Sequence, residues 1–276
     1  TGSGGSVTIP ASIDGYKVTV IGQEAFKQSK IVELNLPNTI TSIYNSAFSQ
    51  CADLKNVNMS YNSTEDYVAE IGDSAFSECG KLTRVKLSEN VTEIGDCAFS
   101  NCALLETLVL PESLKRMGGQ MIEGTAIKSI TVPKNVEYSA GFHNSENGAL
   151  ANANSLEEVI FEDGIKSIPA YILASDDYKS HVTRIVIPDS ITSIGDYAFY
   201  KCGKITGMDL PKKVKEIGFN AFANCTELER ISMSYNEEED FVSNIGRGAF
   251  LGCSKLSQVK LSENVTEIGD CAFSNC

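Results

Sequence analysis

Tryptophan is absent from this chain of 276 residues, and histidine occurs only twice. Long apolar runs are absent too, since none approaches the roughly 20 residues that a helix needs to cross a bilayer. Basic residues are few: 23 Lys and Arg stand against 36 Asp and Glu, which gives a formal net charge of −13. Phosphate backbones and anionic lipids recruit Lys and Arg. We therefore expect no nucleic-acid partner and no membrane insertion.

Candidates for catalysis are equally sparse. A serine or cysteine nucleophile needs a histidine held by a third group, and nothing around Ser145, Ser180 or any cysteine forms such a signature. The two histidines, His143 and His181, are expected in surface loops. No cationic and then apolar leader opens the chain, so we expect that any secretion signal is already removed or was never there. The sequence predicts a protein that is not an enzyme and binds no cofactor.

What the chain does contain is a repeat of about 23 residues. Its most regular part is Ile-Gly-x-x-Ala-Phe, usually followed by Cys three residues after the Phe and then by Leu-x-x-Val-x-Leu-Pro/Ser. The motif begins at the following isoleucines: Ile21, Ile43, Ile71, Ile94, Ile194, Ile217, Ile245 and Ile268. Degenerate units keep the register between them, so we expect about eleven units in a single domain of residues 1–276. The period lies in the range of roughly 20–29 residues that is typical of leucine-rich repeats.

A longer repeat lies over the short one. Residues 59–102 and 233–276 align without gaps and are identical at 32 of 44 positions. Matches at positions expected to be exposed, such as Lys260 and Glu263, are not needed for core packing, so a recent duplication is the simplest explanation. The units between residues 137 and 181 are the most irregular. A solenoid end without a polar cap exposes core side chains to water, which costs free energy. We therefore expect this chain to be a piece of a longer array.

Each column of the repeat has a physical role. In Leu-x-x-Val-x-Leu the Val and the second Leu are two residues apart and point to the same face of a strand. One unit cannot bury that face alone, but units stacked about 4.8 Å apart build a continuous core. Eight of the twelve Phe residues share one column on the opposite wall. The sequence predicts a strand-dominated leucine-rich-repeat solenoid of the α/β horseshoe class, with a parallel sheet on one wall and short turns or 3-10 pieces on the other.

The glycine and cysteine columns both favour small side chains. Tyr44 and Pro169 stand in the glycine position, and Pro fixes φ near −65°, so a positive φ is not compulsory and close backbone approach explains these two units better. Seven of the nine cysteines share one position, where Ser, Thr and Ala also occur, which predicts free buried thiols. The alternative is a disulfide in a pair such as Cys97 and Cys102. Zinc is not expected, because no Cys-x-x-Cys or Cys/His cluster occurs.

Three acidic runs could recruit calcium through their carboxylate oxygens. They lie at residues 65–66, 176–177 and 237–240. An Asp-x-Asp-x-Asp-Gly loop is absent, so we expect solvated loops here, with a calcium site as the alternative.

The combined pattern Leu-x-x-Val-x-Leu-Pro-x-x-Val-x-x-Ile-Gly-x-x-Ala-Phe-x-x-Cys resembles the BspA-like leucine-rich-repeat family. The opening segment from Ile9 to Val18 also resembles a common unit of that family, and the likeness covers essentially the whole chain. Members are mostly secreted or cell-surface proteins of bacteria, often of host-associated anaerobes. The resemblance implies adhesion or protein binding at the cell surface, and it implies no shared catalytic residues.

The outward positions of the predicted strands are the candidate binding surface, because solenoids present extended surfaces to their partners. In the middle units Val109, Ile160 and Val186 place apolar side chains where solvent is expected, with Thr131 in the same row and Glu158 and Arg184 at the rim. An apolar patch with a charged rim is typical of a protein-binding surface. The alternative is an inert sheet face, since single exposed aliphatic side chains are common.

These observations favour non-enzymatic recognition, with an extracellular or host protein bound by the exposed sheet face of a monomer at the cell surface. The alternative is a structural spacer that projects another domain and has no ligand of its own. Glycan binding has little support, because without Trp the chain offers few aromatic platforms.

Overall fold

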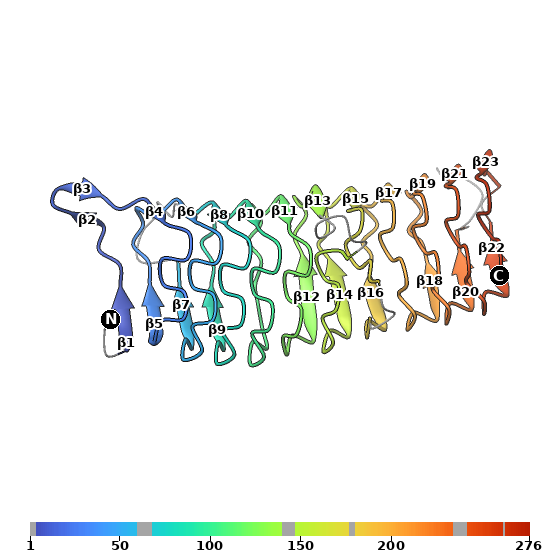
Figure 1. The fold of residues 1–276 in the computed structure, drawn as a ribbon. Coiled ribbons are helices and arrows are strands. Elements are labelled where there is room, and N and C mark those ends of the chain that lie inside the picture. Colours follow the sequence, from blue (N-terminus) through green and yellow to red (C-terminus); the bar gives the residue numbers. More distant parts are fainter. Residues whose placement is uncertain (1–3, 60–67, 140–146, 177–179, 234–241, 262) are drawn as a thin grey trace.

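The chain winds into one continuous stack of coils in the computed structural model (Figure 1). The structure describes residues 4–59, 68–139, 147–176, 180–233, 242–261 and 263–276. Short strands and hydrogen-bonded turns alternate along these residues, and no helix, α or 3-10, occurs among them. The strand-dominated solenoid expected from the repeat is confirmed, and its second wall consists of turns and two-residue strands.

One side of every coil carries the Leu-x-x-Val-x-Leu segment, and we call this side the leucine wall. Its strands are β1 (Gly5–Thr8), β5 (Ile31–Asn35), β7 (Asn56–Asn58), β9 (Arg84–Lys86), β12 (Ser129–Val132), β14 (Glu158–Phe161), β16 (Arg184–Val186), β18 (Gly207–Asp209), β20 (Arg230–Ser232) and β22 (Gln258–Lys260). They form three parallel sheets, ordered β1-β5-β7-β9, β12-β14-β16 and β18-β20-β22. Leu34 pairs with Val57 and Val57 with Val85, so each repeat position lies on its copy in the next coil.

The opposite side carries the Ile-Gly motif, and we call it the isoleucine wall. Its strands are β4 (Val20–Ile21), β6 (Ser42–Ile43), β8 (Glu70–Ile71), β10 (Glu93–Ile94), β11 (Arg116–Met117), β13 (Tyr138–Ser139), β15 (Ser167–Ile168), β17 (Ser193–Ile194), β19 (Glu216–Ile217), β21 (Asn244–Ile245) and β23 (Glu267–Ile268). They form one sheet of six strands and one of five. A hairpin of β2 (Ser12–Ile13) and β3 (Tyr16–Lys17) projects beyond the N-terminal end of the stack (Figure 1).

The number of regular turns is lower than the repeat count suggests. Nine uninterrupted coils carry a described strand on both walls. The expected total of about eleven also counts the first coil, which the β2–β3 hairpin interrupts, and the coil of residues 105–117, whose Leu105–Leu110 segment forms no strand. These two units keep the register of the repeat without completing a regular turn.

The phenylalanine column forms a stack of parallel rings inside the coils. The Phe48 and Phe76 ring centroids are 5.2 Å apart, and those of Phe76 and Phe99 are 5.5 Å apart with an interplanar angle of 3°. Both contacts join adjacent coils, which confirms the central expectation of the repeat. Beside the rings, the Phe76 N–H donates to the Ala98 carbonyl at 2.8 Å. Backbone ladders and offset ring stacking therefore hold the turns together.

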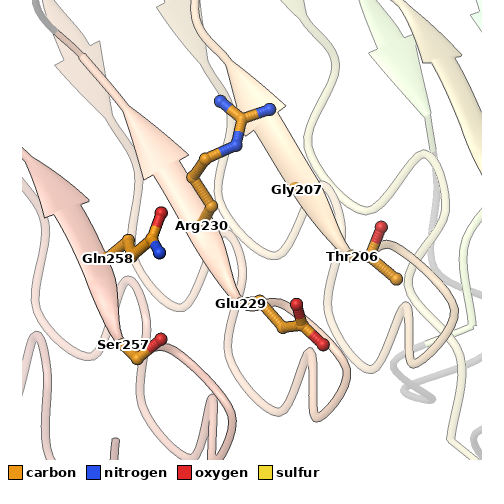
Figure 2. Close-up of a pocket in the computed structure, with 6 residues that line it drawn as sticks. All are labelled: Thr206, Gly207, Glu229, Arg230, Ser257 and Gln258. Atoms are coloured by element: carbon orange, nitrogen blue, oxygen red, sulfur yellow. The ribbon is translucent and has the colours of Figure 1, made fainter.

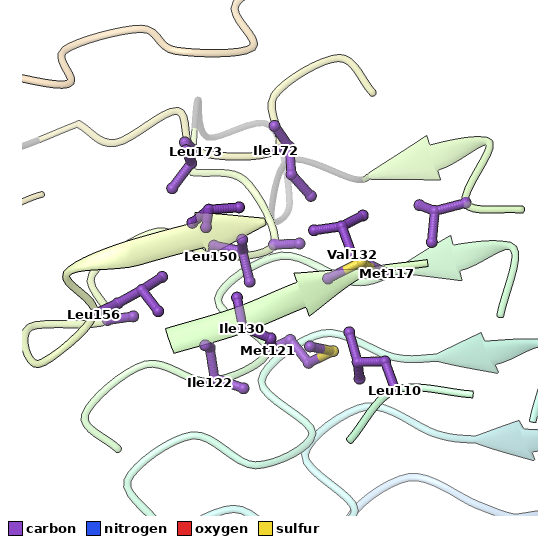
Figure 3. Packing of buried hydrophobic residues seen from close by; sticks show 14 of the residues in the cluster. Leu110, Met117, Met121, Ile122, Ile130, Val132, Leu150, Leu156, Ile172 and Leu173 are labelled. Atoms are coloured by element: carbon purple, nitrogen blue, oxygen red, sulfur yellow. The ribbon is translucent and has the colours of Figure 1, made fainter. Parts of the chain in front are cut away.

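The irregular middle of the chain repacks the same core with aliphatic side chains (Figure 3). Met121 and Ile122 occupy the Ala and Phe positions of one coil, and Ile172 and Leu173 occupy them in another. All four are almost fully buried. A larger residue in the Ala position compensates for a smaller one in the Phe position, so the core keeps its volume.

The backbones of neighbouring coils approach closely at the glycine column, and this explains the column in nearly every coil. The explanation is not limited to the two units where Tyr44 and Pro169 replace the glycine. A Cβ added at Gly95 would lie 2.6 Å from the Asp73 nitrogen, and one added at Gly118 would lie 2.2 Å from the Gly95 carbonyl carbon. The column itself has no positive φ among the described residues. Positive φ falls two residues later, at positions such as Ser74 and Cys97.

Candidate functional site

Two rows of outward side chains run along the leucine wall. The first outward row contains Glu33, Asn56, Arg84, Ser129, Glu158, Arg184, Gly207, Arg230 and Gln258, and the second contains Asn35, Asn58, Lys86, Thr131, Ile160, Val186, Asp209, Ser232 and Lys260. Five of these residues are basic and three are acidic, so the two rows carry a formal charge of +2 in a chain of −13. The two outward rows are therefore slightly basic in a chain that is acidic as a whole.

The structure brings most of the predicted patch residues together. Thr131 pairs with Ile160 and Ile160 with Val186, so the three lie side by side in the second outward row. In the first row Glu158 pairs with Arg184, and the Arg184 guanidinium donates to the Glu158 carboxylate. The side chains of Ile160 and Val186 are half-buried, and Thr131 and Arg184 are exposed. Five of the six predicted residues therefore form one continuous surface over β12, β14 and β16.

Val109 is the member that the ladder does not join to the others. It holds the second-row position on the Leu105–Leu110 segment, which forms no described ladder with β9 or β12. Its residue surface is 82% exposed, the largest value among the exposed apolar residues of the described chain. Val109 thus extends the row from a separate segment and is not part of the sheet that carries Thr131 and Ile160.

A break in the leucine wall separates β16 from β18, and we call it the seam. In regular coil pairs the Arg84 N–H donates to the Lys55 carbonyl and the Met59 N–H donates to the Lys86 carbonyl. The equivalent bonds are absent between residues 183–187 and 205–209, all of which the structure describes. The isoleucine wall stays closed at the same coils, where β17 pairs with β19. The seam is therefore a local opening of one wall.

Gly207 lies at the seam, on a strand that stays paired with β20 on its other side. Glycine inside a strand weakens the strand, because it has no side chain to pack and costs more entropy to order. A hollow of about 350 Å³ opens here, lined by residues that include Arg184, Val186, Met208 and Arg230. A second hollow of about 330 Å³ lies beyond Arg230, beside Glu229, Ser257 and Gln258 (Figure 2).

The sequence interpretation missed this pair of hollows. Gly207 is one of nine residues in the first outward row, and nothing about it alone predicts an open ladder. The available signal was its contrast with its row, because it is the only residue of the first outward row that lacks a side chain. A glycine flanked by two arginines in that row, Arg184 and Arg230, marks the position.

The cysteine column is structural. Each thiol in the column donates to a carbonyl of the preceding coil, as in Cys79 to Phe48 at 3.2 Å and Cys102 to Phe76 at 3.2 Å. Burial raises the pKa of Cys102 to about 12. Burial, together with nearby carboxylates, raises the pKa of Cys97 to about 11. All nine cysteines are free, so Cys97 and Cys102 are not joined, and neither has the low pKa of a reactive thiol.

The structure gives little support to the remaining residues that were considered for catalysis or metal binding. His181 is exposed, and Asp176 accepts a hydrogen bond at 3.0 Å from the Asn147 side chain. His143, Ser145, Asp177 and the acidic runs at residues 65–66 and 237–240 lie outside the described residues. Within the described part of the chain, no three His, Cys, Asp or Glu side chains gather as metal ligands. No helix among the described residues is long and apolar enough to span a membrane.

Comparison with known proteins identifies the repeat. The BspA type leucine rich repeat region matches residues 19–147 and 177–276 in six copies. No curated protein matches the chain. A leucine rich cell surface protein of Faecalibacterium prausnitzii is a structural neighbour with 21% identity, a TM-score of 0.43, and coverage of 94% of this chain and 87% of that one. Another is a leucine-rich repeat protein of Eubacterium ventriosum, with 20% identity, a TM-score of 0.48, and coverage of 100% and 77%.

Proposed function

This chain belongs to the BspA-type leucine-rich-repeat family, and from that premise we propose that it binds a protein through its leucine wall. The partner is an extracellular protein of the host or of its matrix, and the array acts as an adhesin, secreted or held at the cell surface. The array works as a monomer and carries out no catalysis. Both the family and the fold are typical of recognition by a repeated surface.

One observation carries the proposal: apolar and charged side chains meet on a single ladder. Ile160 and Val186 are adjacent on neighbouring strands, and the Glu158–Arg184 ion pair lies beside them in the other row. A half-buried aliphatic centre with a polar rim is the arrangement found in protein interfaces. The rigid stack below fixes these positions, so binding costs little ordering of the array.

Charge also supports a protein partner. The two outward rows carry +2, whereas the whole chain carries −13. An acidic protein surface is attracted to this wall and repelled by the rest of the molecule. A phosphate backbone would need a much larger cluster of Lys and Arg.

Binding to a panel of purified extracellular-matrix proteins tests the proposal. We expect at least one member to bind the intact chain, and the double variant Ile160→Ser, Val186→Ser to bind at least tenfold more weakly with little change in thermal unfolding. Tyr44→Ser is the matched control, because Tyr44 is an exposed apolar residue on the isoleucine wall. If no matrix protein binds, or if both variants bind as the parent does, the adhesin proposal fails and the spacer alternative takes its place.

A further inference from the structure

The seam between β16 and β18 has the features of a site for an extended peptide. In the first outward row Arg184 and Arg230 lie on either side of Gly207, one coil away in each direction. Two guanidinium groups therefore flank a position that has no side chain. Arg230 leans over it, since a Cβ added at Gly207 would lie 3.5 Å from the Arg230 Nε and Nη2 atoms.

Both arginines keep donors for a ligand. Arg184 contacts Glu158 and Arg230 contacts Asp209, in each case through one terminal nitrogen of the guanidinium. A guanidinium has about five N–H donors, so most of them remain for another acceptor. Both ion pairs lie at the surface, where exchange of one carboxylate for another costs little.

The open ladder adds backbone groups to the same place. By the register of the regular coil pairs, the N–H groups of Gly207 and Asp209 face β16, and the N–H and carbonyl of Ile185 face β18. No ladder bond joins them in the described structure. Half-buried Ile185, Val186 and Ile187 line the hollow next to them. Main-chain donors and acceptors beside a hollow that has aliphatic side chains in its lining are what an extended peptide uses for recognition.

We propose that the seam binds an extended acidic segment of a partner protein, with a carboxylate between Arg184 and Arg230 above Gly207 and an apolar side chain in the adjacent hollow. This inference rests on the proposed function, because it names the kind of segment that the leucine wall recognises. Glu229 lies at the far hollow and repels a second carboxylate there, whereas Asp209 at the near hollow is already paired with Arg230. The segment is therefore oriented with its acidic residue toward the seam.

The probe is a fluorescein-labelled peptide of seven residues with Glu at position four and Val at positions two and six, so that all three side chains share one face of a strand. Its partner probe has Gln in place of Glu. Fluorescence anisotropy should show at least tenfold tighter binding of the Glu peptide, and 0.5 M NaCl should remove most of that difference, because salt screens exposed charges.

Variants of the chain locate the site. Arg184→Gln and Arg230→Gln should each weaken Glu-peptide binding at least fivefold, and Gly207→Val should abolish binding by filling the position. Gly207→Val is expected to fold, because Gly207 has no positive φ and the added carbon meets only ordinary contacts. Arg84→Gln is the matched control, since Arg84 occupies the same row, paired with Asn56 and away from the seam.

Three results would overturn the inference: equal binding of the Glu and Gln peptides, an Arg84→Gln effect as large as the other two, or a single-stranded oligonucleotide that binds as tightly as the Glu peptide. Ile160→Ser separates this inference from the proposed function, because Ile160 does not line the hollow. If that variant loses matrix-protein binding while the parent ignores the peptide, only the seam inference fails. If the peptide binds but no matrix protein does, only the adhesin proposal fails.

Discussion

Two nearly identical segments of the chain end up in different environments. Residues 82–102 and 256–276 come from the duplicated blocks, yet Ile94 is 0% exposed and its copy Ile268 is 50% exposed. Leu87 is 6% exposed, whereas its copy Leu261 is 39% exposed. The difference follows from the neighbours: β10 pairs with β8 and β11, whereas β23 pairs only with β21. The burial of a side chain in this array therefore depends on whether a neighbouring coil covers it, and not on the local sequence.

The sharpest contrast is expected for the isoleucine pair. Ile94→Ala should destabilise the chain by about 2–5 kcal/mol, because a fully buried aliphatic side chain leaves a cavity. Ile268→Ala should cost less than about 1 kcal/mol, since half of the residue is already in water. Urea unfolding of both variants measures the difference. Equal losses would show that local sequence, and not the neighbouring coil, determines the burial energy.

Gly95 and its copy Gly269 should behave alike, so the difference between the two segments should not extend to the glycine column. An added Cβ at Gly95 would lie 2.6 Å from the Asp73 nitrogen, and one at Gly269 would lie 2.4 Å from the Arg247 nitrogen. Both clashes involve the preceding coil, which both copies possess. We expect Gly95→Ala and Gly269→Ala each to cost about 1–3 kcal/mol of local stability, measured by hydrogen exchange of the amides in the variant coil. Loss of protection in only one of the two coils would contradict this account.

The smallest effect concerns the thiols Cys102 and Cys276. Burial raises the pKa of Cys102 to about 12, and it also raises the pKa of the more exposed Cys276. The stability that a buried neutral thiol contributes is complete below the unfolded-state pKa, near 9, and is lost as the pH rises toward the folded-state pKa. Cys102→Ala should therefore flatten the fall in stability between about pH 9 and 12 more than Cys276→Ala does. Thermal unfolding across that range tests the order, and a larger effect of Cys276→Ala would contradict it.

The repeat columns made most of the fold predictable. Phe76 and Phe99 could be placed in adjacent coils because identical side chains recur at a fixed spacing. The outward rows followed from strand alternation, so the neighbours Ile160 and Val186 were predictable as well. These features depend on local periodicity, which a single sequence records.

The seam was not predictable in the same way. Leu105–Leu110 has a regular strand pattern but forms no strand, and Ile185 and Met208 fit the pattern although the ladder between their strands is open. Ladder formation depends on the spacing and twist of whole coils, which no single column encodes. The glycine column was predictable only in part, because its clash partners are backbone atoms of another coil.

The most direct test of the central claim, recognition through the leucine wall, is hydrogen exchange of the chain with and without a bound matrix protein. The account predicts added protection in residues 128–132, 157–161 and 183–187, with little change on the isoleucine wall. Protection confined to the isoleucine wall, or no change on either wall at saturation, would contradict it.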